Sequence, residues 1–306
     1  MPLTTTSSKP KKAKRGRQHQ SGAIFGDHVP DLRSYDWIFV NSSGGKDSQV
    51  MLDEVYRLAK IYDVVDRIVV VHCDLDRVEW KGTRELTEKQ ARCYPGVRFR
   101  VVKRPQGDLL QQVLQRWASL RQAGRFDVAP WPSPKERWCT SDQKRAQVMK
   151  VMTSYATISL NRGVTGRQVR ILNCMGLRGQ ESCNRSELPT FEFNKLASNK
   201  TKRHVDNWLP IHGWSVEQVW ARIKKSGVPY HSAYDLGMPR LSCVFCIYAP
   251  YEALLLAAYH NKELLNDYVE VEKKVGFSFK IGLPMAKIQI DMEAGVQPGP
   301  ITTWEM

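Results

Sequence analysis

The chain has 306 residues, 42% of them hydrophobic and 25% charged, which is ordinary for a soluble protein that buries a substantial core. Its formal net charge of +15 is unusual. Such a charge suggests an anionic partner, either a nucleotide, a nucleic acid or both, although a solvated basic surface without a partner gives the same value. No stretch approaches 18 uninterrupted apolar residues and residues 1–26 contain no apolar h-region, which excludes a membrane span and a secretory signal. A cytoplasmic location is therefore expected.

The first predicted segment is a disordered basic tail at residues 1–26. It is rich in Ser, Thr, Lys and Gln, poor in large apolar residues and free of acidic ones. It carries six Lys and Arg residues, so the rest of the chain keeps a charge of +9 and the basic excess is not only a tail effect. Residues 27–250 are expected to form the main domain, and residues 251–306 a helical C-terminal extension packed on it.

Strands and helices are expected to alternate after this tail. Short apolar runs predict the strands, and amphipathic segments between them predict the helices. Such alternation is typical of an α/β fold with a doubly wound, mostly parallel sheet, here followed by a mainly helical C-terminal part. The expected elements, in chain order, are a strand at 37–41, a helix at 48–62, a strand at 67–73, a helix at 83–93, a strand at 97–102, a helix at 108–122, a helix at 142–153, a strand at 169–173, a polar loop at 190–204, a helix at 215–225 and a long helix at 251–274.

The segment from Ser43 to Ser48 reads Ser-Gly-Gly-Lys-Asp-Ser and joins the first apolar strand to a helix. Backbone N–H groups and the helix dipole converge at such a junction, which suits a phosphate group. A Walker A loop is excluded, because Val40 and Asp47 stand where that motif needs Gly and Ser or Thr. The alternative is a Ser-rich turn in which Ser42 or Ser43 caps the helix.

All six residues resemble the pyrophosphate loop (PP-loop) of the ATP pyrophosphatase and phosphoadenosine phosphosulfate (PAPS) reductase superfamily. The resemblance implies a Rossmann-like, adenine nucleotide alpha-hydrolase fold whose nucleotide-binding residues here are Ser43, Gly44, Gly45, Lys46, Asp47 and Ser48. Glycines let the backbone approach an anion, lysine supplies a positive charge and the serine hydroxyls donate hydrogen bonds. For Asp47, holding Mg²⁺, orienting Lys46 and complementing the helix dipole remain open alternatives.

Asp74 follows the second apolar strand, in a segment that resembles the family's Asp-Thr-Gly, with Leu75 and Asp76 in place of Thr-Gly. In the family this loop lies beside the adenosine. The resemblance thus implies that Asp74 contacts the ribose or the adenine, and the alternative is a cap at the end of the strand.

Arg178 and Arg185 occur in a segment that resembles the family pattern Gly-x-Arg-x-x-Glu-Ser-x-x-Arg. In the family these arginines face the phosphate or sulfate end of the nucleotide, so they are expected to form an anion clamp opposite Lys46. With Asp47, these three residues are the candidate catalytic set. The alternative is that the two arginines pair with Glu181 and Glu187 on a surface helix.

The cysteines provide a candidate metal site at Cys139, Cys243 and Cys246. Cys243 and Cys246 form a Cys-x-x-Cys pair, and Cys139 falls where iron-sulfur members of the family carry a Cys-Cys doublet. An iron-sulfur cluster is favoured over zinc, and both over plain structural thiols. The fourth ligand stays open among four residues, which are Cys174, Cys183, His204 and His212.

The resemblance implies an enzyme that binds ATP or a PAPS-type nucleotide with Mg²⁺, cleaves at the α phosphate and assists sulfur transfer, as in the sulfur-inserting enzymes of DNA phosphorothioation systems. The implied partners are an adenine nucleotide, a nucleic-acid acceptor and a sulfur donor protein, either a cysteine desulfurase or a thioredoxin-like protein. Reduction of PAPS or adenylyl sulfate with an external thiol is the alternative, because no Cys follows Cys246 to attack the sulfur. A nucleotide-dependent DNA-binding module is the alternative without enzymatic activity.

Overall fold

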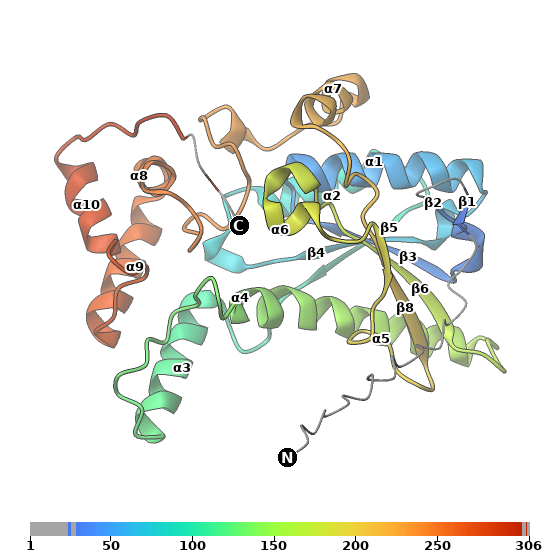
Figure 1. Cartoon of the computed structure of the whole chain (residues 1–306), viewed down its shortest axis with the longest axis horizontal. Coiled ribbons are helices and arrows are strands. Elements are labelled where there is room, and N and C mark those ends of the chain that lie inside the picture. Colours follow the sequence, from blue (N-terminus) through green and yellow to red (C-terminus); the bar gives the residue numbers. More distant parts are fainter. Residues whose placement is uncertain (1–23, 26–28, 302–303, 305–306) are drawn as a thin grey trace, which may run out of the picture.

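The computed structural model describes residues 24–25, 29–301 and 304. At its centre lies a six-stranded sheet in the order β5-β4-β3-β6-β8-β7, in which β7 is antiparallel to β8 and the other neighbours pair in parallel (Figure 1). The strands are β3 (Trp37–Ser42), β4 (Ile68–Cys73), β5 (Arg98–Val102), β6 (Val169–Cys174), β7 (Phe191–Phe193) and β8 (Arg203–Trp208). A separate antiparallel pair consists of β1 (Ile24–Phe25) and β2 (Val29–Pro30). The predicted tail lies outside the described residues except for β1.

Helices cover both faces of the sheet, which confirms the doubly wound α/β class. On one face α1, α2 and α7 pack through a core that includes Val50, Val55 and Ile223, and on the other face α5 packs through Met152 and Tyr155 (Figure 1). The helices are α1 (Lys46–Ile61), α2 (Thr83–Arg92), α3 (Leu109–Gln122), α4 (Trp138–Thr140), α5 (Ala146–Asn161), α6 (Cys183–Ser186), α7 (Val216–Ser226), α8 (Tyr251–His260), α9 (Lys262–Val275) and α10 (Met285–Glu293).

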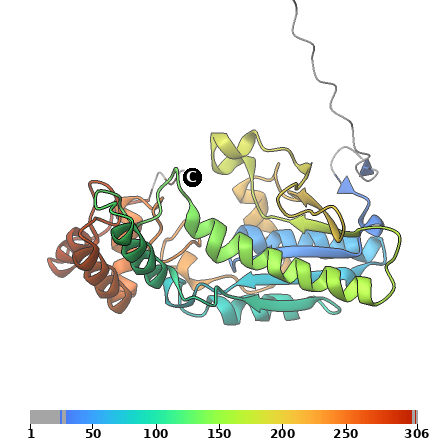
Figure 2. The same ribbon diagram turned by 90° about the horizontal axis from the view of Figure 1, so that it is seen from below.

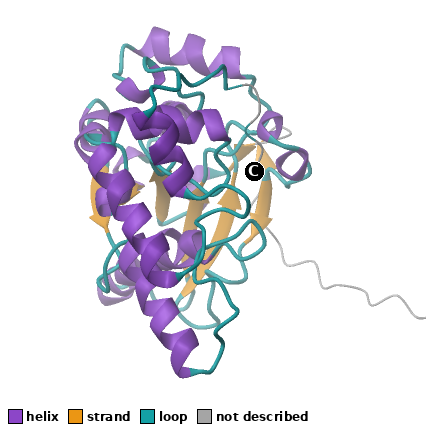
Figure 3. Ribbon diagram, turned by 90° about the vertical axis from the view of Figure 1, so that its left-hand side faces the viewer, coloured by secondary structure: helices purple, strands orange, loops and turns teal. Residues whose placement is uncertain are grey.

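A third hydrophobic core lies beyond the carboxyl ends of the parallel strands. It joins α8, α9 and α10 to α3 and to Trp131 and Trp138, with Tyr268 fully buried at its centre. Figure 3 views the molecule from this side, where the helices stand in front of the strands. The mainly helical C-terminal part is therefore confirmed, and it lies at the end of the sheet where the loop at 43–45 emerges. The division at residue 250 remains a prediction.

The polar loop expected at residues 190–204 is wrong in part, because this segment contains β7 and the beginning of β8. The strand was not predicted because β8 contains polar residues, which find hydrogen-bond partners in the folded chain. Asp206 accepts a hydrogen bond from the Tyr35 hydroxyl at 2.9 Å, and Arg203 donates to the Ala197 carbonyl at 2.6 Å. The long helix expected at 251–274 is also wrong in detail. Asn261, with φ −142° and ψ 53°, separates α8 from α9.

The helices of the described part of the chain are too short or too polar to cross a lipid bilayer.

Candidate functional site

The loop at residues 43–45 connects the central strand β3 to the 16-residue helix α1. Gly44 has φ +75°, and a Cβ atom there would lie 3.2 Å from the Thr83 methyl group and 3.3 Å from that of Thr87. Both the backbone conformation and the crowding therefore favour glycine. Gly45 is the N-cap of α1 and provides no side-chain cap, whereas α3 and α7 both begin with a capping box. The Tyr234 hydroxyl accepts the Lys46 N–H, so the N–H groups of the first turn that follow Lys46 remain for an anion.

A second loop holds the start of α1 from the side of β6. A Cβ atom on Gly176 would lie 3.0 Å from the backbone carbon and oxygen of Asp47 and 3.1 Å from the Ser48 nitrogen. The close backbone approach, which only a residue without a Cβ allows, fixes the segment after β6 against the loop after β3. The carboxyl ends of two adjacent strands therefore meet at one place.

Lys46 is buried, with 3% of its surface exposed, although it is a charged residue. Its ammonium group lies 3.1 Å from the Pro239 carbonyl oxygen, 3.2 Å from an Asp47 carboxylate oxygen and 5.6 Å from the centre of the Tyr234 ring. The Lys46 backbone N–H also donates to the Tyr234 hydroxyl at 2.8 Å. A segment almost two hundred residues away thus covers the loop and positions its lysine.

Arg178 reaches the same carboxylate from the other side. Its Nε donates to Asp47 Oδ1 at 2.6 Å, and the side chain is 4% exposed, with further hydrogen bonds to Gln180 and to the Trp214 carbonyl. Asp47 consequently stands between two cations, each bound to one of its oxygens. Of the three roles left open for Asp47, its contacts in this structure correspond to the orientation of Lys46.

Arg185 does not join this group directly. It donates to Glu181, whose carboxylate also accepts hydrogen bonds from Arg240 and, at 3.1 Å, from the Arg178 backbone N–H. Burial lowers the pKa of Arg185, Glu181 opposes this effect, and the charges of Arg240 and Arg137 lower it further. Glu181 is therefore the carboxylate that links Arg185 to the loop of Arg178, as the pairing alternative expected, but in a half-buried site.

Three site residues escaped the sequence analysis, namely Tyr234, Pro239 and Arg240. Residues 229–237 resemble the family segment that precedes the cysteine pair, and this likeness was the one available signal for Tyr234. The role of Pro239 depends on its backbone carbonyl, which no residue pattern marks.

Asp74 follows β4, at the same end of the sheet. Its Oδ1 accepts a hydrogen bond from the Asp76 backbone N–H at 2.8 Å, and its Oδ2 lies 3.5 Å from Arg84. Asp76 has φ +61°, so the Asp74 side chain stabilises a tight turn. These contacts correspond to the strand-end cap, and the contact with a ribose or adenine remains a prediction.

Cys139, Cys243 and Cys246 lie within electrostatic range of one another. Burial, reinforced by Cys246, Cys139 and Glu79, raises the pKa of Cys243 to about 12, while Lys144 opposes the rise. Burial also raises the pKa of Cys246. However, the described residues contain no group of three or more His, Cys, Asp or Glu side chains arranged to hold a metal ion. The three thiols form a sulfur-rich group, and a metal held by Cys139, Cys243 and Cys246 remains a prediction.

The four residues considered as a fourth ligand each have another environment. Cys174 is buried in the core between α1 and the sheet, and Cys183 is exposed. His204 contacts Asp206 at 2.9 Å and His212 contacts the Arg185 carbonyl at 2.8 Å. None of these contacts involves the three clustered cysteines.

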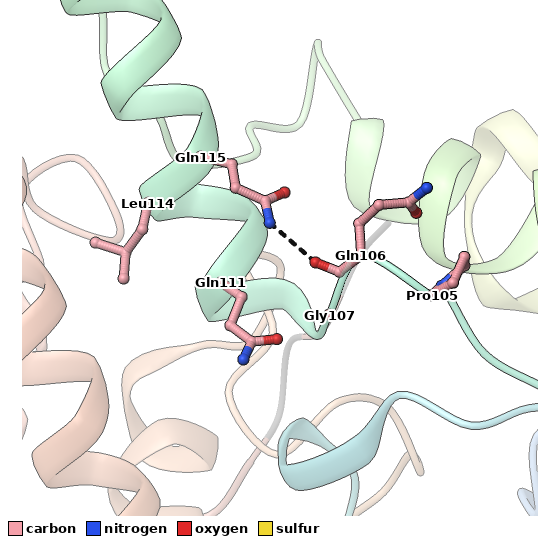
Figure 4. A pocket seen from close by; sticks show the side chains of 6 residues that line it. All are labelled: Pro105, Gln106, Gly107, Gln111, Leu114 and Gln115. Carbon is pink, nitrogen blue, oxygen red and sulfur yellow. Dashed lines mark hydrogen bonds between the residues drawn. The ribbon is translucent and has the colours of Figure 1, made fainter.

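Two cavities lie away from the loop at 43–45. One, of about 500 Å³, lies beside the start of α3 and is lined mostly by polar side chains, where Gln115 donates to the Gln106 carbonyl at 2.9 Å (Figure 4). The other, of about 820 Å³, lies between residues 160–168 and the turn at Lys200 and Thr201. Neither Lys46 nor Arg178 lines either cavity.

Comparison with known proteins shows the following likenesses. A family model described as the phosphoadenosine phosphosulfate reductase domain matches residues 37–249. An uncharacterised protein of Methanocaldococcus jannaschii is 27% identical over 238 residues, which are 77% of this chain and 47% of that protein. An adenosine 5'-phosphosulfate reductase of Neisseria meningitidis is 33% identical over 29% of this chain and 33% of that protein. The chain thus spans less than half the length of these two curated relatives.

Two solved structures share a more distant likeness. The phosphoadenylyl-sulfate reductase of Candida auris, crystallised with phosphate, is 16% identical over 69% of this chain and 83% of that chain, with a TM-score of 0.39. The FMN adenylyltransferase of Candida glabrata, in complex with FAD and inorganic pyrophosphate, is 13% identical over 69% of this chain and 58% of that chain, with a TM-score of 0.42.

Proposed function

The chain belongs to the phosphoadenosine phosphosulfate reductase family, and from this premise we propose that it binds ATP or a related adenylyl nucleotide with the phosphates at Ser43 to Ser48. One observation carries the proposal: Lys46 and Arg178 are held on the two oxygens of Asp47, at the start of α1, where the N-cap residue Gly45 has no side chain. Two oriented cations and free helix N–H groups at one point form an anion site.

The reaction proposed at this site is cleavage between the α and β phosphates. An acceptor oxygen attacks the α phosphorus, the bond to the bridging oxygen breaks and pyrophosphate leaves with the electron pair of that bond. Lys46, Arg178 and the start of α1 stabilise the negative charge that develops on the leaving group. Mg²⁺ bound to the nucleotide would neutralise further phosphate charge. Asp47 fits the role of a positioning residue, because both its oxygens already have cationic partners.

The second step proposed is sulfur transfer to the adenylated acceptor. A hydrosulfide supplied by a sulfur donor protein attacks the atom that bears the adenylyl group, the new bond to sulfur forms and AMP leaves with its oxygen. A nucleic acid is the acceptor that the basic charge of the chain favours, since residues 27–306 carry a net charge of +9. The proposed steps use no metal cluster, and the iron-sulfur cluster expected at Cys139, Cys243 and Cys246 remains a prediction.

Reduction of adenylyl sulfate or PAPS by an external thiol is the second candidate, and the name of the Neisseria relative favours it. In this reaction the thiol sulfur attacks the sulfate sulfur, the adenosine phosphate leaves, and a second thiol releases sulfite with formation of a disulfide. The same Lys46 and Arg178 would then bind the phosphosulfate end of the nucleotide.

Nucleotide turnover distinguishes the two reactions. Purified protein is incubated with Mg²⁺ and either ATP or adenylyl sulfate plus reduced thioredoxin, and pyrophosphate and sulfite are measured. We expect pyrophosphate from ATP, its loss in Lys46→Ala, and its retention in Lys60→Ala, which removes an exposed lysine at the far end of α1. Formation of sulfite without pyrophosphate would contradict cleavage at the α phosphate and support reduction of adenylyl sulfate. If neither product forms, the remaining alternative is a nucleotide-dependent DNA-binding module without enzymatic activity.

A further inference from the structure

An arginine-aromatic rim borders the site on the side of α3 and α4. It consists of Arg116, Lys135, Arg137, Trp138 and Tyr248. The Arg116 guanidinium lies 4.9 Å from the centre of the Trp138 ring, and that of Arg137 lies 5.3 Å from the centre of the Tyr248 ring. Lys135 and Arg137 are exposed, so their charges face solvent.

The rim has an excess of unpaired positive charge. Residues 103–145 contain nine Lys or Arg but four Asp or Glu. Two of these acids are already engaged, Asp108 by Arg77 and Asp142 by Gln112. Within the described part of the chain, no carboxylate forms an ion pair with Lys135 or with the three arginines of this segment that lie over rings, which are Arg116, Arg121 and Arg137.

The rim is continuous with the candidate site. Arg137 is close enough to influence the pKa of both Arg185 and Cys246. In Figures 1 and 2, α3 and the beginning of α5 lie on the same side of the sheet, so the rim leads from the site toward the outer end of α3. There Arg121 lies 5.2 Å from the Trp117 ring centre and 5.3 Å from that of Phe126, which is 59% exposed.

We propose that the arginine-aromatic rim binds a single-stranded nucleic acid and presents it to the site as the acceptor. Guanidinium groups over rings offer N–H donors to phosphates and a flat face to bases, and the exposed ring of Phe126, at the outer end of the rim, can stack with a base of any sequence. On α3, the side-chain amide nitrogen of Gln111 adds a donor at the wall of the 500 Å³ cavity (Figure 4). The role of the nucleic acid as the acceptor rests on the proposed function, whereas its binding to the rim does not depend on that function.

The chemistry of the rim separates a nucleic acid from an acidic protein. An acidic protein binds through carboxylates, which pair with either cation, and it has no bases to stack on a planar group. A nucleic acid also uses the planar stack, which lysine lacks. Replacement of Arg137 by Lys is therefore the informative change, because it keeps the charge and removes the plane.

The test measures binding of a labelled 12-nucleotide single-stranded DNA and RNA to the full chain by fluorescence anisotropy, over a range of salt concentrations. We expect Arg137→Gln and Phe126→Ala each to weaken binding by about fivefold or more, as expected for loss of a phosphate contact or a stacked base. Arg137→Lys should weaken it by about two- to fivefold, as expected for a lost stacking interaction. Arg137→Gln should also reduce the salt slope by about one. The matched control is Lys60→Gln, which removes another exposed cation over a ring, 5.9 Å from the centre of Tyr56, and should change nothing.

Several results would overturn the proposal. They are wild-type affinity in Arg137→Lys and Phe126→Ala, equal loss in Lys60→Gln, or competition by polyglutamate as effective as that by unlabelled oligonucleotide. Pyrophosphate release by the wild-type protein is measured separately. If pyrophosphate release is absent while binding depends on Arg137, the proposed reaction fails and nucleic-acid binding by the rim is retained. If pyrophosphate is released while substitutions in the rim leave binding unchanged, the proposed reaction is retained and the rim proposal fails.

Discussion

At the residue scale, Lys46 and Asp47 illustrate how a short pattern can determine chemistry. Sequence alone pointed to an anion site at Ser43 to Ser48, because the glycines, the lysine and the strand-helix junction are adjacent along the chain. Asp47 and Arg178 are 131 residues apart in sequence and form a hydrogen bond, and the family resemblance had implied that both belong to one site. The pairing of Arg185 with Glu181 was one of the two alternatives that the sequence left open, and the sequence could not decide between them because the choice depends on side-chain packing.

Lys46→Ala should weaken nucleotide binding by roughly 1 to 3 kcal/mol, as for a charge-assisted hydrogen bond, and the fold should survive. Asp47 keeps its bond to Arg178 in this variant, so no buried carboxylate loses both partners. Calorimetric titration with ATP and PAPS measures the effect, with Lys60→Ala as the control. Unchanged affinity for both nucleotides would remove the nucleotide assignment.

His231 makes stability depend on pH. Its Nδ1 accepts a hydrogen bond from the Ala233 N–H at 3.0 Å, so Nε2 carries the proton toward Thr83 and the buried ring is neutral. Burial lowers the pKa of His231, and Glu79 opposes this effect. Because the folded pKa lies below the unfolded value of about 6.5, stability is complete above that pH and falls as the pH decreases through the folded pKa.

Urea denaturation at pH 7.5 and pH 5.5 measures this dependence. The difference between the two midpoints should be smaller in His231→Gln than in the wild type, while His260→Gln, at an exposed position in the last turn of α8, should leave it unchanged. Equal pH dependence in the wild type and His231→Gln would contradict the assignment.

At the element scale, the strands that could be predicted are those whose apolar residues are continuous in sequence. β3, β4 and β6 are of this kind, because helices bury them on both faces. β8 could not be predicted, since its polar residues find partners in segments far along the chain, such as Tyr35. The contact with Pro239 also had no local signal, because it depends on a backbone carbonyl.

Gly176→Ala tests the contact between the segment after β6 and the start of α1. The new Cβ atom would lie 3.0 Å from the Asp47 backbone, so the two segments must separate. We expect a loss of about 1 to 3 kcal/mol in the free energy of unfolding and weaker nucleotide binding. Gly213→Ala is the matched control, because no atom lies within 4 Å of the new Cβ atom. Equal effects of both changes would show that packing at Gly176 is not the cause.

The three clustered cysteines connect the turn at residues 243–246 to α4, about a hundred residues apart in sequence. If a cluster assembles there, Cys139→Ser, Cys243→Ser and Cys246→Ser should each abolish the same visible absorption and lower stability, because metal binding contributes to folding. Cys73→Ser should leave the absorption intact. Anaerobically purified protein that holds stoichiometric zinc, or no metal, would remove the iron-sulfur prediction but not the nucleotide site.

At the scale of the whole molecule, the helices after residue 250 share a core with α3, and this core stands at the ligand end of the sheet. The fold class followed from the alternation of strands and helices. The position of this core did not, because it depends on contacts such as the stacking of Trp131 on Tyr268, which are 137 positions apart.

Deletion of residues 1–23 should act through charge. It removes the six basic residues of the N-terminal segment and retains β1. Nucleic-acid affinity should fall and depend less on salt, while nucleotide turnover persists. Parallel anisotropy and pyrophosphate assays measure both quantities, and loss of turnover would show that this segment contributes to the active fold.

The hydrogen bond from Lys46 to the Pro239 carbonyl has a thermodynamic consequence. A phosphate that draws the lysine ammonium away from Pro239 leaves this carbonyl without its donor, and in that case ligand binding and attachment of the segment around Pro239 compete for one group. Linkage makes the competition reciprocal: a change that loosens the segment tightens nucleotide binding, and a bound nucleotide loosens the segment by the same free energy. Amide hydrogen exchange at residues 240–242 should therefore report occupancy of the nucleotide site.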